Sequence, residues 1–232
     1  MTDNYYSNQQ HLMLLLQFST SHYCRKARLA LGYKGIDYQV ENLTPGLHIL
    51  KLSPLTKGLT TVPVLMAADE IIADSTAILK YLEKVVPFPS FVPAGEKEKN
   101  QAWLLEDWLD ESIGVATRFV YYNYRAGEGK AIDPSLSSQI IINIVRQQYK
   151  ITPARVKLAE ERLENALKIL EEYWQNQPYL VADKLSVADI AATALLSPLA
   201  LIPSYRQKYP WLFARIGEIH QQCREKLPPG LN

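Results

Sequence analysis

Cysteine is scarce in this sequence. Only Cys24 and Cys223 occur among the 232 residues, and two cysteines are too few for the disulfide framework of a small secreted domain. Long apolar runs are scarce as well. The run from Leu12 to Leu16 is far shorter than a bilayer requires, and no basic region precedes it as in a signal peptide. A cytoplasmic, reducing compartment is therefore the default expectation.

An excess of one charge sign is also missing. The sequence has 25 Lys and Arg against 24 Asp and Glu, which gives a formal net charge of +1. A nucleic-acid-binding domain normally carries a clear basic excess, so this class of function is not expected. The apolar share of 47% is ordinary for a soluble globular protein. The length allows one large domain or two small ones to bury a core.

The first part of the chain alternates between strand and helix patterns. Residues 1–10 are polar without periodicity, which predicts a frayed tail. The apolar run over 12–18 predicts a strand buried on both faces. Ser21 precedes a helical repeat over 24–31, and alternating polarity over 36–41 predicts a second strand. This order indicates a parallel strand pair joined by a helical crossover.

A second group of elements follows. The sequence predicts a short helix near residues 47–52 and two hairpin strands over 62–66 and 71–73. Asp74 or Ser75 can cap the next helix, whose apolar residues lie on one side. The predicted order is therefore βαβ, a connection, and ββα.

The rest of the chain is predicted to be helical. Three prolines and a charge cluster indicate a linker over residues 88–98, before an all-helical domain over 99–228. Apolar residues from 103 to 119 mark a long first helix. Ser186 and Asp189 have the spacing of a capping box, with Asp in the place of the usual Glu or Gln.

The segment Ser21-His22-Tyr23-Cys24 lies where the first strand meets the first helix. A helix N-terminus presents unpaired amides and the positive end of its dipole, so a hydroxyl or thiol there can stabilise an anion or ionise more easily. The spacing is that of a C-x-x-C redox motif, but the leading Ser argues against exchange between two thiols. Ser21 can equally be a simple N-cap, and Cys24 a small apolar group packed under the helix.

Two further motifs can bind polar groups. A proline in the strand Thr61-Val62-Pro63-Val64 is allowed only at an edge, a bulge or a special turn. A cis bond there would expose the backbone of Val62 to an extended peptide, whereas a trans proline at a strand start is statistically commoner. Asp74 suits an ammonium group and Ser75 a carboxylate, and ordinary helix capping explains both equally well.

These motifs and elements occur in a specific order: a strand, S-x-x-C, a helix, a strand, V-P-V-L, a hairpin, D-S, a helix and a helical domain with S-x-A-D. This order resembles the cytosolic glutathione transferase superfamily over roughly residues 11–227. The resemblance implies an α+β thioredoxin-like domain (βαβ-ββα) over residues 11–87, which binds glutathione, followed by an all-α helical bundle domain. It puts the catalytic hydroxyl at Ser21. Ser19 is the rival, because some classes use a Ser slightly earlier in this loop.

The resemblance also implies which residues bind glutathione. A residue before a cis proline clamps the cysteinyl backbone, an Asp-Ser pair anchors the γ-glutamyl end, and lysines of the connection often grip the glycine carboxylate. In this sequence these residues are Val62 and Pro63, Asp74 and Ser75, and Lys51 and Lys57.

The second, apolar substrate is expected in the helical domain. Four residues late in the first long helix lie where the family has its open substrate cleft: Arg118, Tyr121, Tyr122 and Arg125. Aromatic stripes are more often part of the core than of a binding site. Two tyrosines and two arginines nevertheless form a suitable half-polar wall for a ligand.

The expected reaction is attack of the glutathione thiolate on an electrophilic centre, with Ser21 donating a hydrogen bond to the thiolate. The alternatives are a glutathione-dependent isomerase or thiol transferase, and a non-catalytic carrier with the same fold. The resemblance implies a cytoplasmic homodimer that acts in detoxification. Neither a metal, a nucleic acid nor a membrane is expected as a partner.

Overall fold

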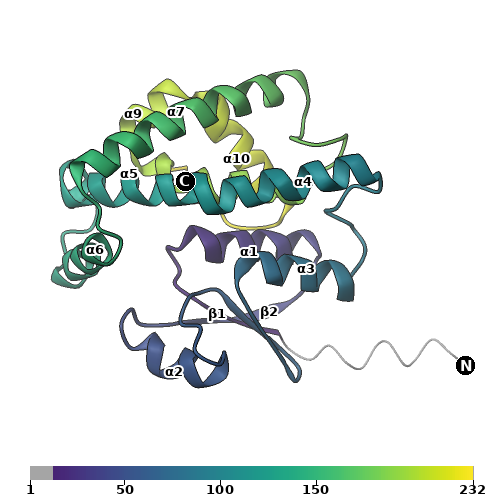
Figure 1. Ribbon diagram of the computed structural model, residues 1–232, viewed down its shortest axis with the longest axis horizontal. Coiled ribbons are helices and arrows are strands. Elements are labelled where there is room, and N and C mark those ends of the chain that lie inside the picture. The colour runs from purple at the N-terminus through teal and green to yellow at the C-terminus, as the bar shows by residue number, and fades with distance from the viewer. Residues whose placement is uncertain (1–12, 232) are drawn as a thin grey trace, which may run out of the picture. The chain divides into compact units, whose positions relative to one another are not determined.

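The computed structural model describes residues 13–231, and the tail predicted over residues 1–10 lies outside this range. The chain divides into two compact units after Pro89. The first is a sheet with helices, and the second is helical (Figure 1). Each unit is described below by itself.

The first unit has the predicted βαβ-ββα order. The short helix expected near residues 47–52 is present and runs on through Pro54. The elements are β1 (Met13–Gln17), α1 (His22–Tyr33), β2 (Tyr38–Asn42), α2 (His48–Leu55), β3 (Val64–Ala67), β4 (Glu70–Ala73) and α3 (Ser75–Val85). This confirms the thioredoxin-like fold class for the first domain.

The four strands form one mixed sheet in the order β2-β1-β3-β4. Strand β1 is parallel to β2 and antiparallel to β3, and β3 is antiparallel to β4. The parallel pair is joined through α1, as a parallel connection requires. Val64 of β3 is paired with Leu16 of β1 on one side and with Ala73 of β4 on the other. These pairings fix the register of β1, β3 and β4 relative to one another.

Both faces of this sheet are covered by helices. Leu16 and Val64 on one face form a buried cluster with Leu52 of α2. Leu15 and Leu65, which alternate with them along the strands, are fully buried on the other face. Figure 1 shows α1 and α3 together on one side of the sheet and α2 on the other. Burial on both faces explains why β1 is a continuous apolar run rather than an alternating pattern.

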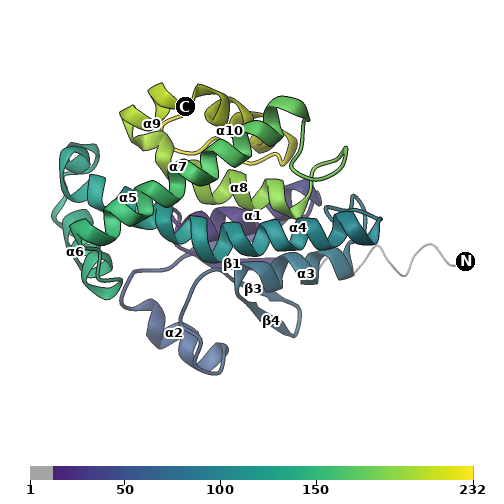
Figure 2. The same cartoon turned by 45° about the horizontal axis from the view of Figure 1, so that its top comes forward.

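The second unit consists of helices packed around α8 (Figure 2). Its α-helices are α4 (Glu96–Trp108), α5 (Gly114–Ala126), α6 (Leu136–Gln148), α7 (Pro153–Asn176), α8 (Val187–Leu196), α9 (Pro203–Lys208) and α10 (Pro210–Gln222). Helix α8 contacts α4, α5 and α10, and every one of its residues is buried. The all-helical fold expected for this part of the chain is therefore present.

Two details of the helical unit differ from the prediction. The long helix expected over residues 103–119 consists of α4, a π-helical turn over Leu109–Ile113, and α5. Helix α4 also begins at Glu96, inside the predicted linker. Glu96 and Glu98 lie in its first turn, where acidic side chains interact favourably with the helix dipole. The charge cluster that suggested a linker is thus the start of a helix.

The predicted capping box at the start of α8 is present and is buried. Asp189 accepts hydrogen bonds from the backbone N–H and the hydroxyl of Ser186, at 2.9 and 2.7 Å. Its second oxygen accepts from the backbone N–H of Leu180 at 2.8 Å and from the indole of Trp174 at 3.3 Å. Burial nevertheless raises the pKa of this carboxyl. The box therefore ties α7, the loop before α8 and α8 itself together.

Within residues 13–231, no helix combines the length and the apolar character that crossing a membrane takes.

Candidate functional site

The register of the sheet brings the predicted glutathione-binding motifs to one edge of the first unit. Strand β1 ends next to the start of β3, because Leu16 is paired with Val64. The end of β4 lies beside the same residue, because Val64 is paired with Ala73. The loop that holds Ser21, the Val62–Pro63 segment and the start of α3 therefore meet at this edge.

Ser21 is the N-cap of α1. Its hydroxyl oxygen accepts a hydrogen bond from the backbone N–H of Cys24 at 3.3 Å, and its own N–H donates to Phe18 O at 3.0 Å. The capping interpretation is thus correct: in this N-cap bond the hydroxyl oxygen is the acceptor, and the same hydroxyl also hydrogen-bonds the side chain of Cys24. Ser21 is half-buried, whereas its rival Ser19 is exposed.

Cys24 is fully buried at the start of α1. Burial raises the pKa of its thiol, and the hydrogen bond with Ser21 opposes this effect without reversing it. A thiol that is buried and protonated is a poor nucleophile. Cys24 therefore behaves as the small apolar group that its place on the helix predicts.

The Val62–Pro63 peptide bond is cis, as the resemblance implies. Within the described residues, the backbone of Val62 makes no hydrogen bond, and its side chain is half-buried beside the cluster of Leu16, Leu52 and Val64. The carbonyl of Pro63 accepts a hydrogen bond from the N–H of Asp74 at 3.3 Å. This bond joins the proline segment directly to the start of α3.

Asp74 and Ser75 begin α3 and have different environments. Asp74 is exposed, caps the helix by accepting from the N–H of Ala77 at 3.0 Å, and has a φ of +87°. Non-glycine residues rarely take this conformation, and such outliers cluster at binding sites. Ser75 is only 1% exposed, and its hydroxyl has no hydrogen-bond partner in the part of the chain that the structure describes. An unpaired buried hydroxyl beside a helix N-terminus can hold a carboxylate.

The two lysines of the connection lie on and just after α2. Lys51 is exposed and pairs with the carboxylate of Glu41 at 2.5 Å. Lys57 is also exposed and has a φ of +58°, which turns the chain after the helix. A ligand carboxylate would have to compete with Glu41 for Lys51, whereas no ion pair is present at Lys57 in the described residues.

One residue near this edge was missed by the sequence analysis. The ring of His48, the first residue of α2, lies edge-on to Phe18 at the end of β1, with 4.9 Å between centroids. Its Nδ1 accepts a hydrogen bond from the N–H of Gly46 at 3.0 Å, and partial burial lowers its pKa. His48 is therefore neutral at pH 7. Only the folded connection brings it beside Phe18, so the sequence carried no signal for it.

The residues expected to bind the second substrate all lie on α5, and one of them contacts α6. Arg125 donates to the hydroxyl of Tyr121 at 3.0 Å and to the hydroxyl of Ser138 at 3.1 Å. The rings of Tyr121 and Tyr122 are edge-on, 5.2 Å apart, and the guanidinium of Arg118 lies 4.3 Å from the ring centre of Tyr149. Burial raises the pKa of Tyr122 to about 12, so its phenol stays protonated.

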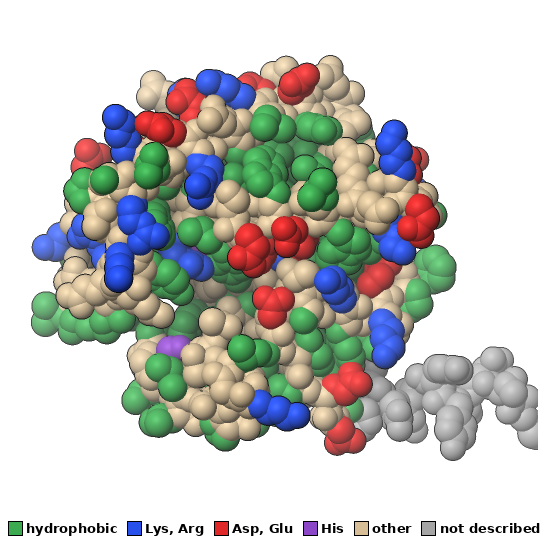
Figure 3. Space-filling view, in the orientation of Figure 1, with side chains coloured by type: hydrophobic (Ala, Val, Ile, Leu, Met, Phe, Trp, Pro, Cys, Tyr) green, Lys and Arg blue, Asp and Glu red, His purple; other side chains and the backbone are tan. Residues whose placement is uncertain are grey.

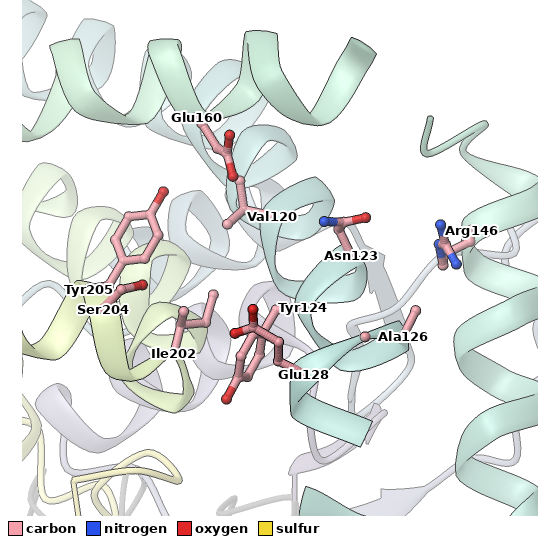
Figure 4. Close-up of a pocket in the computed structure, with 11 residues that line it drawn as sticks. Val120, Asn123, Tyr124, Ala126, Glu128, Arg146, Glu160, Ile202, Ser204 and Tyr205 are labelled. Carbon is pink, nitrogen blue, oxygen red and sulfur yellow. The ribbon is translucent and has the colours of Figure 1, made fainter. Parts of the chain in front are cut away.

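A separate pocket of about 440 Å³ lies on another face of α5 (Figure 4). Its lining includes Val120, Asn123 and Tyr124, together with Glu160 of α7 and Tyr205 of α9. These α5 residues recur at helical spacing on a face that excludes the four predicted substrate residues. Figure 4 shows Glu160 and Tyr205 on one side of the pocket and Arg146 on the opposite side.

Within residues 13–231, no three His, Cys, Asp or Glu side chains are grouped as metal ligands. The polar groups at the edge of the sheet are instead hydroxyls, a carboxylate and backbone amides. Such groups can bind the charged ends of a peptide.

Comparison with known proteins identifies the family. Residues 15–90 match the family model of the glutathione S-transferase N-terminal domain, and residues 137–224 match that of the C-terminal domain. Together the two matches include most of the chain.

Individual relatives agree with these matches. The chain is 39% identical over 126 residues to Glutathione S-transferase 1 of Dianthus caryophyllus, covering 51% of this chain and 54% of that protein. It is 27% identical over 110 residues to a stringent starvation protein A homolog of Pasteurella multocida, covering 44% and 50%. In both cases the chain spans only about half the length of the relative.

A solved structure has the same fold over nearly the whole chain. A glutathione S-transferase from Methylobacillus flagellatus with glutathione bound superimposes with a TM-score of 0.68 at 23% identity, covering 91% of this chain and 97% of that one. The two domain matches, in the expected order and on the expected elements, establish the relationship. The chain therefore belongs to the glutathione S-transferase superfamily.

Proposed function

We propose that this protein binds glutathione at the edge of the first unit and transfers its thiolate to an electrophilic substrate. The observation that carries the proposal is the buried hydroxyl of Ser75, which has no partner among the described residues and lies at the N-terminus of α3. A buried polar group normally has a hydrogen-bond partner, so this one favours a bound ligand. The γ-glutamyl carboxylate of glutathione has the required charge.

The remaining groups suit the rest of the tripeptide. The free backbone of Val62 can pair with the cysteinyl residue, since Pro63 is tied to Asp74 at the start of the same helix. The hydroxyl proton of Ser21, which its N-cap bond does not use, can be donated to the sulfur of glutathione, which favours the thiolate over the thiol. Lys57 or Lys51 can hold the glycine carboxylate.

The buried environment of Cys24 argues against a cysteine-based thiol transferase. Such an enzyme needs an accessible thiol with a lowered pKa, whereas the pKa of Cys24 is raised by burial. The hydroxyl of Ser21 cannot form a mixed disulfide. We therefore favour conjugation, in which the sulfur that reacts belongs to glutathione.

Titration calorimetry with glutathione and turnover of a chloronitroaromatic electrophile test the proposal directly. Ser75→Ala should weaken glutathione binding about tenfold or more, because a hydrogen bond to a charged group is lost. The same substitution should leave the free energy of unfolding unchanged or slightly raised, because an unsatisfied buried hydroxyl is removed. A general structural role for Ser75 predicts the opposite change in stability.

Thr193→Val is the matched control. Thr193 also has a fully buried hydroxyl without a partner among the described residues, but it lies inside α8 in the helical unit. Its replacement should leave glutathione affinity unchanged. If Ser75→Ala and Thr193→Val leave glutathione affinity equally unaffected, the site assigned at α3 is wrong.

A non-catalytic carrier is the second candidate, and one comparison favours it. The matching homolog from Pasteurella multocida is named as a stringent starvation protein rather than as a transferase. Glutathione binding without turnover of any electrophile would support this candidate and contradict conjugation.

We further propose a cytoplasmic homodimer with a role in detoxification, as in the family. Sedimentation at micromolar concentration as a species with the mass of one chain would contradict the dimer.

A further inference from the structure

We infer that the second substrate of the proposed transferase carries a negative charge, and that Arg125 binds it between α5 and α6. This inference rests on the proposed function and names the substrate class of its second site. The class that fits is an aromatic electrophile with a carboxylate or a similar anionic group.

The environment of Arg125 is unusual for an arginine. Only 8% of its surface is exposed, yet it forms no ion pair with any residue in the described range 13–231. Its two terminal nitrogens donate to the neutral hydroxyls of Tyr121 and Ser138, and its buried Nε has no partner among these residues. A guanidinium stays protonated at physiological pH, and a buried charge without a counter-ion is costly. The geometry therefore leaves one donor and one positive charge for a ligand.

No nearby carboxylate compensates this charge directly. Arg125 does influence the carboxylate of Asp133, but that carboxylate is fully exposed. The pKa of Asp133 is lowered mainly by hydrogen bonds from Ser135, and the effect of Arg125 is the smallest of the causes. Asp133 forms no ion pair with Arg125 in the described range and does not fill the position beside Nε.

The surrounding segment has the charge that an anionic ligand needs. Residues 114–155 contain six basic side chains and two acidic ones, a net charge of +4 in a chain whose total is +1. Lys and Arg side chains gather on the left of the face shown in Figure 3, where Figure 1 labels α5 and α6. Such a local field raises the concentration of anions near the surface.

The neighbouring rings indicate that the anion is attached to an aromatic body. Tyr121 and Tyr122 pack edge-on beside Arg125, and both are only half-buried. Tyr122 remains a neutral phenol and so adds no negative charge to the cluster. Aromatic rings prefer to pack against other rings, while planar Arg side chains bind carboxylates through paired hydrogen bonds. The arrangement thus matches an aryl carboxylate better than a small inorganic anion.

The test compares a chloronitrobenzoate with the matching chloronitrobenzamide as substrates for glutathione conjugation. Each kcat/KM is divided by the spontaneous rate constant with glutathione, which removes the difference in intrinsic reactivity. The wild-type protein should prefer the anionic substrate about tenfold or more, the range of one charge-assisted hydrogen bond. Arg125→Gln should abolish this preference and leave the affinity for glutathione unchanged.

Two further variants separate charge at this site from overall charge and folding. Arg162→Gln removes the same charge from an exposed position on α7 and should keep the preference. Arg125→Lys keeps the positive charge but loses the planar guanidinium, so it should retain part of the preference for the anionic substrate. A variant that simply failed to fold would retain none of this preference. Equal normalised kcat/KM values for the two wild-type substrates would overturn the inference while leaving conjugation intact.

Binding of nitrobenzoate and nitrobenzamide, measured by calorimetry without glutathione, tests the site even if no turnover occurs. Tighter binding of nitrobenzoate that is lost in Arg125→Gln supports the anionic site independently of catalysis. Equal binding of the two compounds contradicts it. If inorganic phosphate binds as tightly as nitrobenzoate, the site is one for small anions, and the aromatic substrate class is wrong.

Discussion

Ser21→Ala is the substitution that most directly separates capping from catalysis. The hydroxyl of Ser21 accepts from the N–H of Cys24 at 3.3 Å, so its removal should cost about 1 kcal/mol of stability as a lost N-cap. If the hydroxyl proton also stabilises the glutathione thiolate, a second loss appears in the reaction. A decrease in conjugation of about tenfold corresponds to about 1.4 kcal/mol, at the low end for a hydrogen bond to a charged group.

The pH dependence of kcat/KM identifies the cause of this decrease. A hydrogen bond to the thiolate lowers the pKa of the bound thiol, so Ser21→Ala should move the ascending limb of the profile to higher pH. Ser21→Thr keeps a hydroxyl and should restore most of the rate. Thr152→Ala is the control for capping alone, since Thr152 caps α7 by accepting from the N–H of Arg155 at 3.4 Å. It should lower stability to a similar extent and leave the pH profile unchanged.

Cys24→Ser provides the refuting comparison. Cys24 is fully buried with a raised pKa, so placing a hydroxyl there should change stability more than rate. If Cys24→Ser abolishes activity and Ser21→Ala does not, the assignment of Ser21 is wrong and a cysteine-based thiol transferase becomes the better interpretation. If neither substitution changes the rate, Ser19 or backbone amides must activate the thiol.

Two other predictions concern the helical unit. Asp189→Ala leaves four hydrogen-bond donors without an acceptor, so it should lower the free energy of unfolding, measured with denaturant, by about 4 kcal/mol or more. Asp183→Ala, at an exposed position, is the control and should cost little. A small loss for Asp189→Ala would contradict the role of Asp189 in joining α7 to α8. Burial raises the pKa of Tyr122 to about 12, so the unfolded state loses this proton at lower pH than the folded state. The free energy of unfolding of the wild type should therefore fall as pH rises from about 10 to 12. Tyr122→Phe should make this fall less steep by about 1.4 kcal/mol per pH unit, and an unchanged slope would show that the phenol is not buried.

The first unit could be predicted closely because its elements carry simple periodic signals. Leu15 and Leu65 belong to apolar runs, and the structure buries them completely. The cap at Ser21 and the capping box at Asp189 were visible as residue types at fixed spacings. Local backbone chemistry determined each of these features, so one sequence was enough to find them.

Helix α6 and the π-helical turn lacked such signals. Leu136, Ile140 and Ile144 are exposed at successive turns of α6, while Ile142 is buried, so apolar residues lie on more than one side of the helix. No single stripe marks it as amphipathic. The π turn at Leu109–Ile113 lies between α4 and α5 and contacts α8, and such tertiary contacts are not encoded in a local pattern.

The same contrast applies to the residues assigned to glutathione and to those assigned to the second substrate, and it has a consequence for specificity. Ser21, Pro63 and Ser75 lie at the ends of elements, where the sheet register fixes their backbone positions. The environment of Arg125 depends instead on side chains from two helices, and Ser138 lies in α6, which no single apolar stripe marks. Substitutions around Arg125 can therefore change the acceptor without moving any group assigned to glutathione. If the proposed roles are right, specificity for the second substrate should be much easier to alter than affinity for the first.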